Sequence, residues 1–266
     1  MIPRAFITEW SNVVPWQTNE QVEQDLIICR ALVEIFSDSF MRDQVAFRGG
    51  TALHKLYLHP QPRYSEDIDL VQIHSGPIKP ILESLQERLA FLGKASVDQT
   101  GINTTLRYRF ASEIPPVVNL RLKIETNGRE HFSVLGFHQI PFQVKSLWYS
   151  GECMLTTYQL EELLGTKIRA LYQRRKGRDM FDLNKSLRAV PKLDVPMMMN
   201  CYKEYMIFST QKMPTLKEYL RNLEAKMKDQ AFMGDTVALL RPDEKYDPAQ
   251  AFKLITESVL IENYPK

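Results

Sequence analysis

Hydrophobic residues in the first 150 positions of this 266-residue chain follow two different spacings. Between Thr18 and Asp38 they recur every three or four positions, which predicts a long amphipathic helix capped by Thr18 or Asn19. Around Ile68 and Leu70 they alternate with carboxylates, which predicts a strand with one buried face. The same two spacings predict helices over 51–58 and 76–93, and strands over 44–48, 104–112, 116–127 and 141–149.

The pattern changes after about residue 155, where helical spacing alone continues. We expect a helix from Tyr158 that ends with Gly177 as its C-terminal cap, followed by helices over 178–190, 195–209, 215–229 and 247–263. This order predicts a bilobed α+β or α/β fold. Residues 1–155 would form a lobe with a mixed sheet flanked by helices, and residues 156–266 would form a helical lobe.

Composition adds that the chain is an ordinary globular protein, with 44% hydrophobic and 25% charged residues. No apolar run approaches the roughly 18 residues that a membrane-spanning helix needs, and the first ten residues contain no apolar signal core. Cys29, Cys153 and Cys201 are widely spaced, as expected of buried thiols in a reducing compartment. We therefore expect a cytoplasmic protein that does not associate with membranes.

Two aspartates are the first candidates for residues of a functional site. Asp67 and Asp69 are two positions apart on a predicted strand, so their side chains share a face, while Ile68 and Leu70 point into the core. Carboxylates held this close repel each other unless a cation lies between them, and hard oxygen ligands suit Mg²⁺, with Mn²⁺ as the alternative. Such a pair also occurs by chance on solvated strands.

Residues before and after this pair extend the hypothesis. Gly49 and Gly50 precede a predicted helix, where backbone N–H groups can approach a phosphate, and Thr51 adds a hydroxyl. The alternative is an ordinary strand-to-helix turn. Glu125 would complete a three-carboxylate cluster if its strand lies beside the Asp67 strand. Otherwise it is a solvent-facing glutamate flanked by Lys123.

The segment from Lys167 to Arg178 contains six basic residues and no acidic one. The spacing of Lys167, Arg174 and Arg178 places them on one face of a continuous helix, where they suit the phosphates of a nucleotide. A solvated helix surface is the alternative. Asp179 could cap the next helix, and Asp182 could orient Lys167 or Arg178 or contact the nucleotide.

These segments together resemble the AbiEii family, the nucleotidyltransferase toxins of type IV toxin–antitoxin systems, which belong to the DNA-polymerase-β-like superfamily. "FRGGTALHKLYL…RYSEDIDLV" is similar to the first motif of the family, a glycine pair followed by Asp-x-Asp. "EELLGTKIRALYQRRKGRDMFDL" resembles the second conserved region, a lysine-bearing helix followed by Arg-Asp-x-x-Asp.

The resemblance implies transfer of nucleotides from an NTP to RNA, with the tRNA acceptor end as the leading acceptor and blocked translation as the result. It implies Asp67 and Asp69 as metal ligands, Lys167 as the triphosphate-binding lysine, and Asp182 or Asp179 as the later acidic residue. Ser65, which we expect among the nucleotide-binding residues, matches a serine that has been linked to autophosphorylation in relatives. The family also implies a cognate AbiEi-type antitoxin encoded nearby.

Two other classes of function remain open from the residues alone. One is a non-catalytic module of the same fold that binds a nucleotide or a partner protein. Retention of Asp67, Asp69 and Lys167 argues against such a degenerate site. The other is a glycosyltransferase whose Asp-x-Asp pair holds a nucleotide-sugar through a metal, although this leaves the basic segment unexplained. The sequence does not specify which NTP is used.

Overall fold

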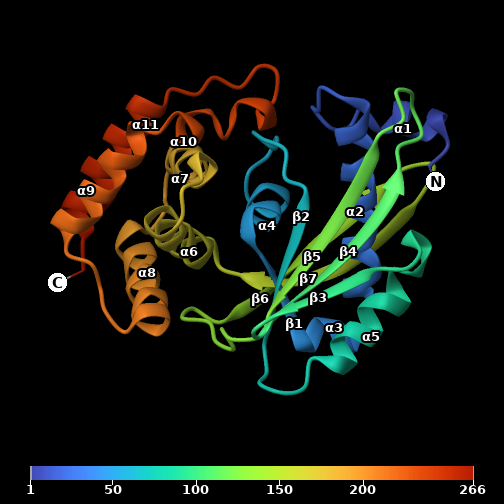
Figure 1. Cartoon of the computed structure of the whole chain (residues 1–266), viewed down its shortest axis with the longest axis horizontal. Coiled ribbons are helices and arrows are strands. Elements are labelled where there is room, and N and C mark those ends of the chain that lie inside the picture. The colour runs from blue at the N-terminus through green and yellow to red at the C-terminus, as the bar shows by residue number, and fades with distance from the viewer. Residues whose placement is uncertain (1, 266) are drawn as a thin grey trace. The chain divides into compact units, whose positions relative to one another are not determined.

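The computed structural model describes residues 2–265, and the chain separates into two compact units. Unit 1 is Met1–Tyr158 and unit 2 is Gln159–Lys266. Unit 1 mixes strands and helices, whereas unit 2 is built from helices (Figure 1). The α+β class expected from the sequence is confirmed.

A seven-stranded mixed sheet forms the centre of unit 1 (Figure 1). Its strand order is β3-β4-β5-β2-β1-β7-β6. The central strand β2 runs antiparallel to β1 and parallel to β5, and β1 runs parallel to β7. The bounds are β1 Val45–Arg48, β2 Asp67–Gln72, β3 Ser96–Thr100, β4 Asn103–Ala111, β5 Asn119–Asn127, β6 Phe137–Lys145 and β7 Ser150–Tyr158.

Helix α2 is the main helix of unit 1 and packs against β5, β6 and β7. It begins as predicted, because the Thr18 side chain accepts a hydrogen bond from the backbone N–H of Gln21. Its Leu26, Leu32 and Phe36 side chains are completely buried, which the helical spacing of apolar residues predicted. The helices of unit 1 are α1 Arg4–Trp10, α2 Asn19–Ser37, α3 Ser39–Gln44, α4 Gly49–Leu56 and α5 Lys79–Arg88, with a 3₁₀ turn at Ala90–Leu92.

Two strands and the exact course of a third did not follow from the sequence. All five residues of β3 are exposed, so that strand carries no alternation of buried and exposed positions. In β7 the last four residues, 155–158, are all buried, which again hides the two-residue period. Strand β6 spans Phe137–Lys145, so the predicted strand over 141–149 was placed too late in the chain.

Unit 2 begins with α6, which packs against α7 and α8. This helix ends at Gln173 because Arg174 has an extended backbone, so the prediction that Gly177 caps it was wrong. Gly177 is instead the first residue of α7. The helices are α6 Leu160–Gln173, α7 Gly177–Ala189, α8 Val195–Thr210, α9 Leu216–Met227, α10 Gln230–Gly234 and α11 Pro248–Ile255, with a 3₁₀ turn at Val237–Leu239 and a π-helical turn at Thr256–Ile261.

The early end of α6 also changes the predicted basic face. Lys167 lies on α6, but Arg174 follows its end and Arg178 belongs to α7. The three residues therefore do not share one face of a continuous helix, and that prediction was wrong. Within residues 2–265, no helix is both long enough and apolar enough to span a membrane.

Substitution of Gly177 tests the close approach of α7 to α10. A Cβ atom at Gly177 would lie 2.0 Å from the carbonyl oxygen of Phe232, whereas one at Gly234 would meet nothing within 4 Å. We expect Gly177→Ala to lower the free energy of unfolding by about 1–3 kcal/mol, as overpacking against fixed atoms does. Gly234→Ala should change it by less than about 1 kcal/mol. Urea denaturation of both variants measures the difference, and equal effects would contradict this packing.

Candidate functional site

Four charged residues lie together on one face of the sheet in unit 1. The parallel pairing of β2 with β5 places Asp67 beside Lys123 and Asp69 beside Glu125. Directly paired residues point to the same side of a sheet, so their four side chains share a face. Ile68 lies between the two aspartates and is completely buried on the other face. The strand of Glu125 thus lies beside that of Asp67, which is the condition under which Glu125 was expected to complete a three-carboxylate cluster.

Lys123 lies between two of these acids. Its Nζ atom is 3.2 Å from Asp67 Oδ2 and 3.2 Å from Glu125 Oε2. Although burial opposes it, the carboxylates of Asp67 and Glu125 raise the pKa of Lys123. The sequence offered Lys123 only as the flanking residue of a solvent-facing Glu125. The structure makes it part of the same charged group.

The electrostatics of Asp69 fit a cation-binding site. Burial is the main cause that raises the pKa of Asp69, and the neighbouring charges of Asp67 and Glu125 raise it further, while Arg48 and Lys123 oppose them. Ionised acids that repel each other in this way favour a bound cation, and the carboxylate donors are those that Mg²⁺ prefers. Among residues 2–265, no group of three or more His, Cys, Asp or Glu side chains is already arranged as a metal centre. The role of Asp67, Asp69 and Glu125 as metal ligands stays a prediction.

The glycine pair begins α4, and its first member, Gly49, lies directly against Asp69. Gly49 has a φ of +81°, and a Cβ atom there would lie 2.0 Å from Asp69 Oδ2. A side chain at this position would therefore meet both a strained backbone and the carboxylate. Gly50 is the second residue of α4, and a Cβ atom there would lie 2.7 Å from Nη2 of Arg63. The pair lets the start of α4 approach β2 closely.

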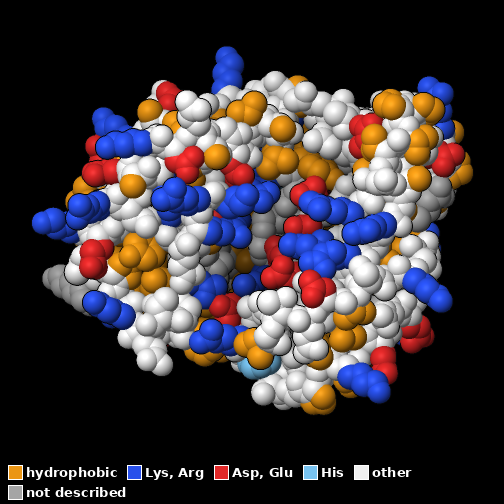
Figure 2. Space-filling model, viewed as in Figure 1, with side chains coloured by type: hydrophobic (Ala, Val, Ile, Leu, Met, Phe, Trp, Pro, Cys, Tyr) orange, Lys and Arg blue, Asp and Glu red, His pale blue; other side chains and the backbone are white. Residues whose placement is uncertain are grey.

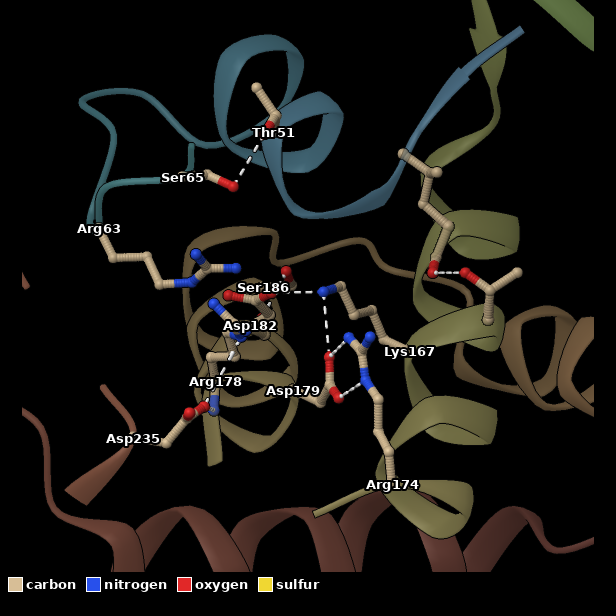
Figure 3. A network of polar contacts seen from close by, with 12 residues as sticks. Thr51, Arg63, Ser65, Lys167, Arg174, Arg178, Asp179, Asp182, Ser186 and Asp235 are labelled. Carbon is tan, nitrogen blue, oxygen red and sulfur yellow. Dashed lines mark hydrogen bonds and ion pairs between the residues drawn. The ribbon is translucent and has the colours of Figure 1, made fainter. Parts of the chain in front are cut away.

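Thr51 connects this turn to the segment that leads into β2. Its hydroxyl is buried, donates to the backbone carbonyl of Asp67 and lies 2.8 Å from the Ser65 hydroxyl (Figure 3). These contacts give Thr51 and Ser65 a role in holding the start of β2. The predicted contacts of Gly49, Gly50, Thr51 and Ser65 with a nucleotide remain predictions.

Arg48 and Glu130 are two residues near the acids that sequence reasoning missed. Arg48 ends β1, pairs in register with Asp69, and forms an ion pair with Glu130. Its charge also opposes the rise in the pKa of Asp69. Because Arg48 directly precedes Gly49 in the sequence, its place beside the candidate site could have been predicted. Glu130 follows the end of β5 in a loop, and no local pattern indicates it.

Unit 2 contains a second charged group, centred on Lys167 (Figure 3). The Lys167 Nζ atom lies 3.1 Å from Asp179 Oδ1 and 2.8 Å from Asp182 Oδ2. Arg174 contacts both oxygens of Asp179, each at 2.7 Å. Asp179 is therefore a partner of two basic residues and not the cap of α7, whose N-cap is Lys176. The contact of Asp182 with Lys167 agrees with the alternative in which Asp182 orients this lysine.

The buried charges of this group balance one another. Asp179 and Asp182 are completely buried, and the Lys167 side chain is only 8% exposed. Although burial alone would raise it, Lys167 and Arg174 hold the pKa of Asp179 below its ordinary value. The carboxylate therefore stays ionised at neutral pH and fixes the lysine.

The rest of the basic segment is not a uniform solvated surface. Arg169 is buried, with its guanidinium 5.2 Å from the centre of the Tyr205 ring. The Arg175 side chain is 70% exposed and lies 3.3 Å from Asp229. Arg178, predicted to bind a nucleotide, lies 3.7 Å from Asp235, which it shares with Lys176. Figure 2 shows basic and acidic side chains interspersed in this way across the visible surface.

Comparison with known families gives one clear result. Residues 30–257 match the model of the family described as nucleotidyl transferase AbiEii toxin, type IV toxin–antitoxin system. The match covers most of the chain, and the chain therefore belongs to this family of nucleotidyltransferase toxins. Both segments that suggested the resemblance lie within the matched region. A search of curated proteins gives no match.

Solved structures show the same fold at low sequence identity. MenT4, a nucleotidyltransferase toxin from Mycobacterium tuberculosis H37Rv, is 17% identical with a TM-score of 0.69, and the similarity covers 98% of this chain and 90% of that one. JHP933 from Helicobacter pylori is 16% identical with a TM-score of 0.57, covering 92% and 93%. The shared fold extends over nearly the whole chain in both cases.

A glycine substitution tests the contact between the Gly-Gly turn and Asp69. Gly49→Ala adds a Cβ atom that meets the carboxylate, in addition to the cost of about 1–2 kcal/mol for a positive φ. Gly136 has nearly the same φ, +80°, but a Cβ atom there would meet nothing within 4 Å. We expect Gly49→Ala to lose at least about 1 kcal/mol more unfolding free energy than Gly136→Ala. Denaturation of both variants measures this, and equal losses would mean that only the backbone conformation matters.

The buried group of unit 2 predicts a pH-dependent stability. The folded-state pKa of Asp179 lies below its ordinary value of 3.8, so its ionised form stabilises the protein above that pH. This contribution is lost as the pH falls through the folded-state pKa. Asp179→Asn should therefore cost about 3–5 kcal/mol at pH 7, and the difference from wild type should shrink below pH 4 (about the ordinary carboxyl pKa).

A matched substitution provides the control for this measurement. Asp98 pairs with Arg107 at 3.1 Å, but both side chains are well exposed. Asp98→Asn should cost no more than about 1 kcal/mol at any pH. If chemical denaturation gives similar losses for the two variants, Asp179 does not have the stabilising role assigned to it.

Proposed function

We propose that this nucleotidyltransferase transfers nucleotides from an NTP to RNA in a reaction that depends on Mg²⁺ or Mn²⁺. The observation that carries the proposal is the group formed by Asp67, Asp69 and Glu125 on adjacent strands, with the Gly-Gly start of α4 against it. Nucleotide transfer requires positioning and neutralisation of phosphate charge more than a specialised nucleophile. Acids for a cation and backbone donors for phosphates are both present in unit 1.

The residues of unit 1 divide these tasks. Asp67 and Asp69 would hold the metal ion, with Glu125 as a third ligand. When bound, the ion supplies positive charge to phosphate oxygens. The N–H groups of Gly49 and Gly50 begin α4 and would be the backbone donors to a phosphate in this proposal. Thr51 and Ser65 hold the chain that connects α4 to the acids.

The residues of unit 2 contribute positive charge to the use of the NTP. Lys167 carries over from the family resemblance as the triphosphate-binding lysine. Asp179 and Asp182 fix its ammonium by the two short contacts, which is the role of the later acidic residues in this proposal. Arg178 is the further candidate for nucleotide contact. Arg175 and Lys176 are more exposed and suit the backbone of the RNA.

The acceptor and partner follow from the family. We take the tRNA acceptor end as the acceptor, and arrested translation in the cell as the consequence. An antitoxin of the AbiEi type encoded nearby is the expected partner, since the family is that of a type IV toxin–antitoxin system. The cytoplasm contains all of these reactants.

Transfer to RNA is tested by incubating the full chain with total RNA, Mg²⁺ and each labelled NTP in turn. We expect labelled tRNA with at least one NTP. Asp69→Asn and Lys167→Met should each lower the rate by about 100-fold or more, as loss of an essential charged contact does. Glu66→Gln alters the carboxylate just before β2 and should leave the rate within about threefold of wild type.

Other products separate the remaining classes of function. Label transferred from UDP-sugar, and not from any NTP, would identify a glycosyltransferase. Bound NTP without transfer to any RNA would identify a binding module. Label on an RNA other than tRNA would retain the nucleotidyltransferase and replace only its acceptor.

A further inference from the structure

We propose that Lys123 is the built-in counter-ion of the acid group and competes directly with the divalent cation for it. In the metal-free protein its ammonium holds Asp67 and Glu125, and a divalent cation must displace it to bind. Lys123 is thus a positioning residue that sets the concentration of metal ion at which the acid group binds the ion. This inference rests on the proposed metal site and concerns a residue outside its ligand set.

The position of the ammonium carries the argument. Lys123 Nζ lies at the same distance, 3.2 Å, from one oxygen of Asp67 and one of Glu125. Those residues are two of the three proposed metal ligands, so the ammonium and a metal ion would use the same oxygens. The paired register of β2 and β5 fixes this placement, because Asp67 is the direct neighbour of Lys123.

The charge balance explains why a resident cation is needed. Asp67, Asp69 and Glu125 bring three negative charges to one face, and Lys123 brings one positive charge. Arg48 is the other basic residue near Asp69, but it forms an ion pair with Glu130. Without Lys123 the metal-free Asp67 and Glu125 would lose the ammonium that they share, and Arg48 would offset only part of the charge at Asp69.

The exposure of Lys123 makes the exchange possible. Its side chain is 29% exposed and carries four flexible methylene groups, so its ammonium can move toward solvent when a more highly charged ion arrives. Lys167 in unit 2 is a useful contrast, because its side chain is 8% exposed and both of its acidic partners are completely buried. That lysine is fixed, whereas Lys123 is exchangeable.

The test measures binding of Mn²⁺ alone to the full chain by electron paramagnetic resonance, without NTP or RNA. We expect Lys123→Met to bind Mn²⁺ at least about tenfold more tightly than wild type, because the competing charge is gone. Lys123→Arg keeps the charge and should stay within about threefold of wild type. Lys79→Met removes an equal charge from a solvent-exposed pair with Glu83 and should leave binding unchanged.

A second measurement tests the counter-ion role without metal. In the presence of a chelator, Lys123→Met should melt at a lower temperature than wild type, and saturating Mn²⁺ should raise its melting temperature by more than it raises that of wild type. Lys79→Met should show neither change. Weaker or unchanged Mn²⁺ binding by Lys123→Met would overturn the proposal.

An acid variant distinguishes this failure from failure of the metal site itself. If Asp69→Asn abolishes Mn²⁺ binding while Lys123→Met binds like wild type, the metal site stands and the competition by Lys123 is wrong. If wild type, Lys123→Met and Asp69→Asn all bind Mn²⁺ equally, the ion does not use these acids and both proposals fail. If Lys123→Met binds Mn²⁺ more tightly than wild type, and adding Asp69→Asn to that variant abolishes the binding, both proposals are supported.

Discussion

The parallel register between β2 and β5 is the constraint on which the chemistry of unit 1 depends. It places Asp69 beside Glu125 and Asp67 beside Lys123, although the two members of each pair are 56 positions apart in the sequence. A shift of one residue would turn Lys123 and Glu125 to the opposite face, where Ile124 is now completely buried. The requirement to bury Ile124 therefore also fixes the position of the charged residues.

Each unit neutralises paired acids with a lysine, but burial makes the two arrangements chemically different. Asp179 and Asp182 are completely out of solvent, so removal of Lys167 would take a counter-charge from two buried carboxylates, of which Asp179 would keep Arg174. Asp67 and Glu125 keep a third or more of their side-chain surface, and water can solvate them when Lys123 leaves. The first arrangement fixes a charge in place, whereas the second is compatible with the proposed replacement of Lys123 by a metal ion.

The sequence predicted the parts of the fold in which local patterns and tertiary packing agree. Helix α2 and strand β2 followed from spacing, whereas the place of Glu125 was left open because it depends on which strand lies beside β2. Strand β3 was not predicted because none of its residues is buried. Gly177 was misassigned because the need for glycine at this position comes from the carbonyl of Phe232, which is distant in the sequence. The contacts of Lys123 likewise depend on strand register, which a single strand does not reveal.

A sheet that carries repelling acids on one face must be stabilised from the other. The residues that alternate with the charged ones on β2 and β5 are no more than 1% exposed: Ile68, Leu70, Leu122 and Ile124. Burial of each such side chain contributes about 1.5–3 kcal/mol, whereas repulsion between two partly solvated carboxylates costs about 1–4 kcal/mol before a nearby cation offsets it. The apolar face therefore outweighs the repulsion. Strong alternation along two paired strands allows a group of neighbouring acids to persist in a folded protein, as the proposed metal site requires.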